Sequence, residues 1–228
     1  MFFVDERRII AEHDRLLAGN AILLDHLKMI NASLELLADL PVAHVDNSPD
    51  QITLGRLGIR CFNSGAAAIS LVRQGYWQPA VATIRDLIEV YFLLDLFSRE
   101  PSQLTQWRTL SEKDREKNFK PVKVRERLDK LDGYKEEKRK QAYKLLSQQG
   151  AHVSPDGFSL ISPDNLTAVG PFPDERRLKA TIEELVKHLS FTAVVFCTSI
   201  KSGNEIVLST KARFFHQLEG WRERYFPR

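Results

Sequence analysis

Cysteine is scarce in this 228-residue sequence, and its two cysteines lack the spacing of metal ligands. Cys61 and Cys197 lie in apolar helical segments, so we expect buried thiols in a reducing compartment rather than a disulfide. A glycine-rich phosphate loop, a Gly-x-Ser-x-Gly elbow and a His-Glu-x-x-His motif are also missing. The common classes of nucleotide hydrolase, serine hydrolase and metallopeptidase therefore lose their usual sequence support.

Long hydrophobic runs are lacking as well. The longest nearly uncharged run, residues 189–200, is shorter than the roughly 18–20 residues of a membrane span. At the N-terminus the apolar residues precede the charges, which is the reverse of a secretory signal. A net charge of +3 is too small to indicate nucleic acid or membrane binding by itself. We expect a cytoplasmic protein that does not enter a membrane.

The composition present is that of an ordinary globular protein, with 43% hydrophobic and 28% charged residues. Apolar spacing of three and four residues from Ile9 onward predicts one long helix, about 5–39, bent at Gly19-Asn20 and stopped by Pro41. His13 and Asn20 occupy positions in its apolar seam. We interpret His13 as a satisfied core histidine. The seam can pack within its own chain or against a second copy, where Asn20 would fix the register of a homodimer.

Turn residues divide the rest of the chain. The predicted segments are a helix from Ser48-Pro49-Asp50 to about Gln74, a buried helix over 77–98, two or three exposed helices within 108–144, a loop at about 150–173, and final helices at about 174–201 and 205–225. The fold class is all-α: a single bundle-like domain over 1–228 with six to eight helices.

Four finer expectations follow from local patterns. The small residues of Ser64-Gly65-Ala66-Ala67-Ala68 allow a close crossing with another helix. Breaks are expected near Lys120-Pro121 and Asp132-Gly133, and residues 157–161 could form a short ribbon. The aromatic C-terminus, 214–226, either docks on its own core or supplies anchors to a protein interface.

Residues 108–144 are the most basic part of the chain, with 14 Lys and Arg against 8 Asp and Glu. Such a segment could track the phosphates of RNA. Its acids are nevertheless interspersed at helical spacing, which is typical of a solvated face whose charges pair with one another.

The buried helix carries charges that indicate a candidate site. Arg85 and Glu89 lie four residues apart on an otherwise apolar helix, and a guanidinium removed from water needs partners. Tyr143 and Ser147 share a face of the helix that ends near Gly150, and His152 follows it. If that helix end packs on 77–98, these five side chains converge.

Two interpretations of this cluster are open. In the first, it is a structural network in which Glu89 neutralises Arg85, Tyr143 donates to one of them, and His152 caps the helix end. Alternatively it binds an anion, or His152 acts as acid or base while Arg85 stabilises negative charge. No cofactor is expected, since the phosphate-loop and related motifs are missing, and no metal is expected, because His44, Asp46 and Asp50 are interpreted as solvated loop residues.

The order of Gly75, Arg85-x-x-x-Glu89 and Tyr143-x-x-x-Ser147-x-x-x-x-His152 resembles bacterial all-helical families of unknown function, some of them related to the HEPN superfamily. The resemblance covers roughly residues 60–155. It implies a metal-independent ribonuclease of a toxin or phage-defence type, with Arg85 and His152 as the reactive pair. The HEPN spacing of Arg and His itself occurs here only between Arg7 or Arg8 and His13.

The expected function is that of a helical protein that acts through protein–protein contacts and associates with itself. Its basis is the seam that contains Asn20, the aromatic C-terminal helix and the lack of enzyme motifs. The HEPN-like ribonuclease, with RNA as its partner, is the alternative.

Overall fold

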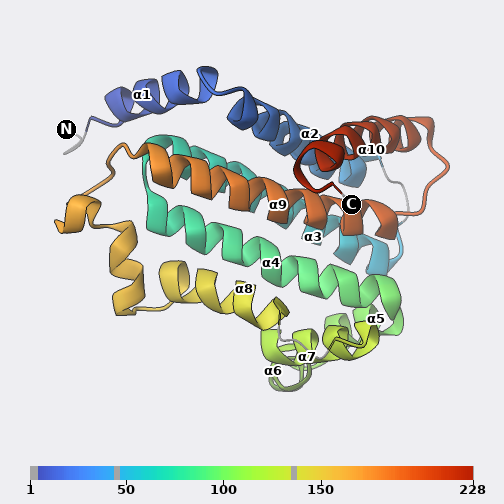
Figure 1. The fold of residues 1–228 in the computed structure, drawn as a ribbon. Helices are drawn as coiled ribbons and strands as arrows, with labels where there is room; N and C mark the ends of the chain where they lie inside the picture. Colours follow the sequence, from blue (N-terminus) through green and yellow to red (C-terminus); the bar gives the residue numbers. More distant parts are fainter. Residues whose placement is uncertain (1–4, 44–46, 135–137, 228) are drawn as a thin grey trace.

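Helices make up all the regular secondary structure in the described part of the chain (Figure 1). The computed structural model describes residues 5–43, 47–134 and 138–227, and these ranges contain ten α-helices, a π-helical turn and two 3-10 turns. The expected all-α single domain is confirmed, but the helices outnumber the six to eight predicted. The excess arises because 5–39 divides into two helices and because residues 102–109 form a helix that was not predicted, whereas 108–144 contains three helices, within the two or three expected.

α4 runs through the middle of the molecule, with α3 and α9 packed against it and α8 beneath it in the view of Figure 1. α2 covers α9, and α10 packs on α2. The helices are α1 (Glu6–Ala18), α2 (Ala21–Ala43), α3 (Pro49–Gln74), α4 (Trp77–Arg99), α5 (Ser102–Thr109), α6 (Glu112–Phe119), α7 (Pro121–Asp132), α8 (Lys138–Leu146), α9 (Glu175–Ser199) and α10 (Glu205–Tyr225).

The predicted long helix 5–39 is wrong in its continuity. α1 ends at Ala18 and α2 starts at Ala21, because Asn20 caps the new helix. Its Oδ1 accepts hydrogen bonds from the backbone N–H groups of Ile22 at 3.0 Å and Leu23 at 3.1 Å. Pro41 does not stop α2, which continues for two residues beyond it to Ala43.

The apolar seam of these two helices faces the protein's own core. Ile9, Leu23, Ile30 and Leu37 are buried, and α2 packs on α9, α10 and α3. Intramolecular packing, the first of the two alternatives, therefore uses this face. Asn20 serves as a helix cap rather than as a buried register residue in the seam.

α3 and α9 approach closely at two glycines. A Cβ at Gly58 would lie 2.3 Å from Phe196 Cζ, and one at Gly65 would lie 2.9 Å from Leu189 Cδ1. The crossing predicted at Ser64–Ala68 is confirmed, with α9 as the partner helix. Gly58 makes the tighter approach, since the ring of Phe196 fills the space where its side chain would be.

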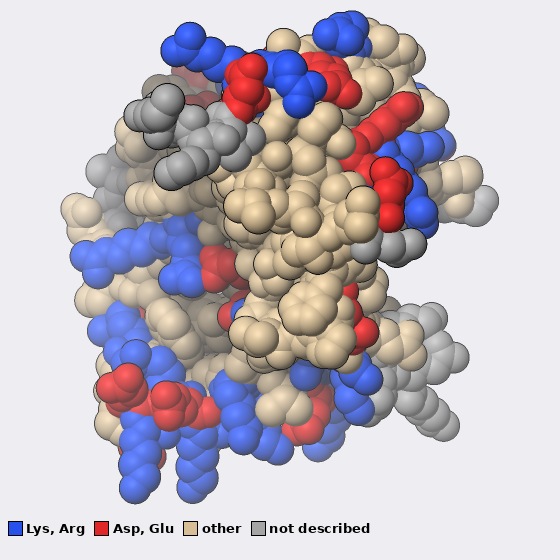
Figure 2. Space-filling model, turned by 90° about the vertical axis from the view of Figure 1, so that its left-hand side faces the viewer, with Lys and Arg blue, Asp and Glu red and all other residues tan. Residues whose placement is uncertain are grey.

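Residues 108–144 form short helices that break where the sequence predicted. α6 ends at Phe119 before Pro121, and α7 ends at Asp132 with Gly133 in the left-handed conformation. Lys and Arg crowd the lower part of the face in Figure 2, at the height of α6 to α8 in Figure 1, with acidic side chains between them. Arg139 pairs with Asp129 at 2.6 Å and also with Asp132, so much of this charge is internally paired.

The expected loop at 150–173 contains short helical turns instead of a ribbon. α8 runs into a π-helical turn, η1 (Ser147–Ala151), followed by 3-10 turns η2 (Pro155–Leu160) and η3 (Pro163–Asn165). The predicted strand at 157–161 is therefore wrong. The segment is tied to the start of α4, where Trp77 Nε1 donates to the carbonyl of Phe172 at 3.2 Å.

The aromatic C-terminal helix docks on its own core through Phe214, Leu218 and Trp221, which are buried. Trp221 Nε1 donates a hydrogen bond of 3.0 Å to Nδ1 of His26 on α2. Among the described helices, none combines the length and the apolar character that a bilayer-spanning segment requires.

Candidate functional site

Arg85 and Glu89 occupy successive turns of α4 and form a direct ion pair. Arg85 Nη2 lies 2.8 Å from Glu89 Oε1, and their side chains are 19% and 27% exposed. The guanidinium is therefore largely, but not wholly, withdrawn from water. A pair of this kind needs further hydrogen bonds to offset the cost of desolvation.

α8 and the first residue of η1 supply those hydrogen bonds. Arg85 Nε donates to Ser147 Oγ at 2.9 Å, and Arg85 Nη2 also donates to the hydroxyl of Tyr143. The same hydroxyl donates to Glu89 Oε1 at 2.6 Å. Four of the five predicted side chains thus form one network between α4 and the α8–η1 segment.

The protonation of Tyr143 is set by its surroundings. Burial and the adjacent Glu89 raise the pKa of Tyr143 above its ordinary value. The phenol therefore stays protonated at neutral pH and acts as a hydrogen-bond donor to the carboxylate. This arrangement joins Arg85 to Glu89 through a third group and does not present a free base.

The structure does not bring His152 into this network. His152 is the C-cap residue of η1, where its backbone N–H donates to the carbonyl of Ser147 at 2.8 Å. Its side chain is exposed, and its imidazole makes no hydrogen bond, ion pair or ring contact with any residue the structure describes. The expected pairing of Arg85 with His152 is therefore not formed.

Arg125 is a member of the cluster that sequence analysis missed. Its guanidinium carbon lies 4.2 Å from the ring centroid of Tyr143, while that of Arg85 lies 4.8 Å from the same centroid. Arg125 is 8% exposed, and its Nη1 has no hydrogen-bond acceptor in the described ranges. The sequence does indicate that Arg125 is buried, because Val124, Arg125 and Leu128 lie at helical spacing on one face of α7.

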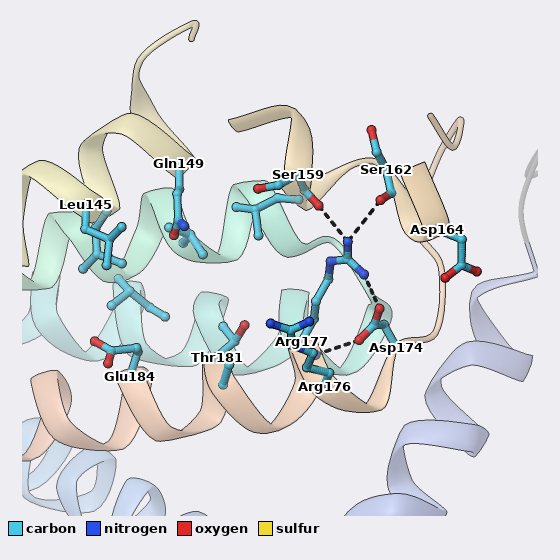
Figure 3. A pocket seen from close by; sticks show the side chains of 15 residues that line it. Leu145, Gln149, Ser159, Ser162, Asp164, Asp174, Arg176, Arg177, Thr181 and Glu184 are labelled. Carbon is cyan, nitrogen blue, oxygen red and sulfur yellow. Dashed lines mark hydrogen bonds and ion pairs between the residues drawn. The ribbon is translucent and has the colours of Figure 1, made fainter. Parts of the chain in front are cut away.

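A separate hollow of about 650 Å³ lies beside the α8–η1 segment, between α4 and α9 (Figure 3). Figure 3 shows Arg177 at one end, where it donates to the carbonyls of Ser159 at 2.7 Å and Ser162 at 3.2 Å and pairs with Asp174. This arginine holds the 150–173 segment against the first turn of α9. Its donors are used within the chain, so its role here is structural.

Glu184 borders the same hollow from α9. Burial opposes its ionisation, but hydrogen bonds from His188 and Lys187 outweigh that effect and lower the pKa of Glu184 to about 2. Oε1 lies 2.6 Å from Lys187 Nζ, and Oε2 lies 3.1 Å from His188 Nε2. The carboxylate is therefore ionised and already paired at neutral pH.

An apolar groove of about 680 Å³ lies between α9 and α10. Phe215 and Phe226 line it and remain 39% and 47% exposed, although both are large aromatic residues. Glu219, Arg222 and Glu223 also line it, and none of these three makes an ion pair with another described residue. The groove thus combines exposed aromatic area with unpaired charges of both signs.

His13 and the two cysteines are accounted for by the core. His13 Nδ1 lies 2.9 Å from the carbonyl of Arg73, and its Nε2 accepts from the backbone N–H of Asp174 at 3.3 Å, so the predicted satisfied histidine is confirmed. Cys61 and Cys197 are free and buried, and burial raises their pKa to about 12 and about 11. Both are inert thiols.

The described ranges contain no group of three His, Cys, Asp or Glu side chains suited to a metal ion. Asp50, one of the loop residues considered in the sequence, instead accepts hydrogen bonds from Thr105 and Arg108. His44 and Asp46 lie outside the described residues.

Comparison with protein-family models, curated proteins and solved structures gives no match to this chain. The resemblance to HEPN-related families therefore rests on the sequence pattern alone.

Proposed function

We propose that this protein acts through protein–protein contacts and associates with itself through the groove between α9 and α10. The observation that carries this proposal is the exposure of Phe215 and Phe226 along one apolar groove of about 680 Å³. Aromatic residues are enriched at the centres of protein interfaces, where they bury large areas at low entropic cost.

The charges at the groove favour a second copy as the occupant. Glu219, Arg222 and Glu223 lie within two turns of α10, and a two-fold related copy presents the same set in the opposite direction. In such an isologous interface Arg222 of each copy can meet the acids of the other. Self-complementary charge therefore accompanies the apolar area.

The polar cluster on α4 supports a non-catalytic role because Arg85 and Tyr143 are both engaged by other members of the cluster. Arg85 is engaged by Glu89, Tyr143 and Ser147, and Tyr143 is held as a phenol. A ribonuclease that uses Arg85 and His152 would need the exposed imidazole to reach this network. The geometry gives that alternative no support.

Light scattering across a concentration series tests the proposal. The expected species at higher concentration has twice the 26.2 kDa mass of the chain. Phe215→Glu should shift the equilibrium to the monomer, because a carboxylate placed in the groove would have to be desolvated on association. Phe158→Glu is the matched control, since Phe158 is 54% exposed and lies on η2 away from the groove.

Two results would contradict the proposal. One is a single 26.2 kDa species at every concentration. The other is a dimer that Phe215→Glu leaves intact, which would place the interface elsewhere. Circular dichroism of both variants establishes that the fold is retained before their masses are compared.

A further inference from the structure

An open depression of about 640 Å³ lies where α3, α4, α5 and α6 meet, apart from both the polar cluster and the α9–α10 groove. Four arginines line it, Arg56 and Arg60 from α3, Arg108 from α5 and Arg115 from α6, against the single carboxylate of Asp86. Two of these arginines belong to the basic segment 108–144 and two do not. The fold therefore gathers cations that are distant in the sequence.

The carboxylate of Asp86 is already saturated. Its Oδ1 lies 2.5 Å from Arg60 Nη2, its Oδ2 lies 3.2 Å from Arg60 Nε, and Ser64 Oγ donates to Oδ2 at 2.8 Å. Asp86 can thus neutralise Arg60 but not the other three guanidinium groups. Outside the depression, Asp50 binds Arg108 through Nε at 2.9 Å.

Arg56 and Arg115 are left without a counter-charge. Arg56 makes no hydrogen bond or ion pair with any residue in the described ranges. It also lies four residues before Arg60 on α3, a spacing at which like charges destabilise a helix. An anion bound between them would remove that repulsion.

Arg115 is positioned by neutral groups. Its Nε donates to the carbonyl of Trp107 at 2.9 Å and its Nη2 to the carbonyl of Leu110 at 3.0 Å. These two bonds fix the orientation of the guanidinium while leaving its charge uncompensated. A cation held in place before the ligand arrives loses less entropy on binding.

We propose that this depression binds the phosphate groups of a nucleotide, either free or within a nucleic-acid strand. Guanidinium groups match phosphate oxygens with paired hydrogen bonds, and several converge here. The volume lies within the roughly 300–1,000 Å³ of ordinary small-molecule sites, so there is room for more than a phosphate ion. Half-buried Trp107 lines the same space, with the Arg115 guanidinium carbon 5.5 Å from its ring centroid, so a base would meet an aromatic ring and a cation together.

Calorimetric titration of the purified full-length protein tests this inference with five probes: ATP, AMP, inorganic phosphate, adenosine and a short single-stranded RNA. Affinity should rise from AMP to ATP, and adenosine should not bind, because phosphate carries the recognition. Comparison of the affinities for ATP and for the RNA distinguishes the two sources, and ATP should displace the RNA because both use this depression.

Arg56→Glu should weaken binding of the phosphate probes by about tenfold or more, the usual effect of losing a charge-assisted hydrogen bond. Arg56 has no partner within the described chain, and its replacement removes the repulsion from Arg60, so stability should not fall. Arg7→Glu is the matched control, since Arg7 on α1 is also exposed, and it should alter affinity little. Trp107→Phe should weaken ATP more than inorganic phosphate.

Failure to bind any phosphate probe at millimolar concentration would overturn the inference. Equal weakening by Arg56→Glu and Arg7→Glu would also overturn it, because binding would then follow only the overall charge. Neither result depends on the state of association, so the groove proposal is tested separately.

Discussion

Removal of the carboxylate from Glu89 should destabilise the fold by about 2–3 kcal/mol. Breaking a fully buried ion pair costs about 3–5 kcal/mol because one charge is stranded. Here the Arg85 and Glu89 side chains are 19% and 27% exposed, so water partly solvates the stranded guanidinium and reduces the penalty. Tyr143 also loses the acceptor for its hydroxyl, which adds on the order of 1 kcal/mol.

A double-mutant cycle isolates the contribution of the pair. Glu89→Ala, Arg85→Ala and the double variant are compared by urea unfolding, followed by circular dichroism and extrapolated to water. We expect a coupling energy of about 1–2 kcal/mol, since removing both charges leaves neither unpaired. Arg8 and Glu12 form the matched control, an i,i+4 pair at 3.6 Å with side chains 64% and 38% exposed.

The control pair should show a coupling of about 0.5 kcal/mol or less, as exposed helix pairs do. The reasoning would be refuted if the coupling between Arg85 and Glu89 were no larger than that between Arg8 and Glu12. Such a result would mean that Tyr143 and Ser147 add nothing to the pair.

Two further predictions concern the core. Gly58→Ala should lower the free energy of unfolding by about 1–3 kcal/mol, because the added Cβ would lie 2.3 Å from Phe196 Cζ. Gly55→Ala should not destabilise the protein, because its Cβ would lie 3.9 Å from the nearest atom. Thermal unfolding of both variants checks this. Burial lowers the pKa of His26 below 6.5, so stability should be greatest above about pH 6.5 and fall as pH drops through the lower folded pKa. Protonation of Nδ1 would break the hydrogen bond from Trp221. The free energy of unfolding should therefore fall with a slope that approaches about 1.4 kcal/mol per pH unit. This slope should vanish in His26→Leu, and an equal slope in that variant would contradict the assignment.

The sequence predicts this fold best where a rule acts over one or two helical turns. Ser48 and Gly75 bound α3 as expected, because capping and the left-handed conformation depend on local backbone chemistry. The association of Arg85 with Glu89, Tyr143 and Ser147 could also be anticipated. A spacing of four residues places Arg85 beside Glu89 and Tyr143 beside Ser147, and a buried guanidinium needs the hydrogen bonds that the second pair supplies.

Other features depended on tertiary contacts that a periodic pattern does not contain. The position of Asn20 in the apolar seam is compatible with one continuous helix. In the structure its side chain instead accepts hydrogen bonds from two backbone N–H groups of α2, so a new helix begins there. The burial of Arg125 is marked in the sequence only by Val124 and Leu128 on the same helix face, within a segment rich in exposed charge. His152 follows the π-helical turn, which alters the direction in which the chain leaves α8.

The missing side chain at Gly58 also determines the rotational setting of α3. Arg56 and Arg60 lie two residues to either side of Gly58, about 160° around the helix axis from it at 3.6 residues per turn. Because the ring of Phe196 occupies the notch at Gly58, α3 cannot turn about its axis without a steric clash. The absence of a side chain at Gly58 thus places Arg56 and Arg60 on the face of α3 that points away from α9, toward α5 and α6.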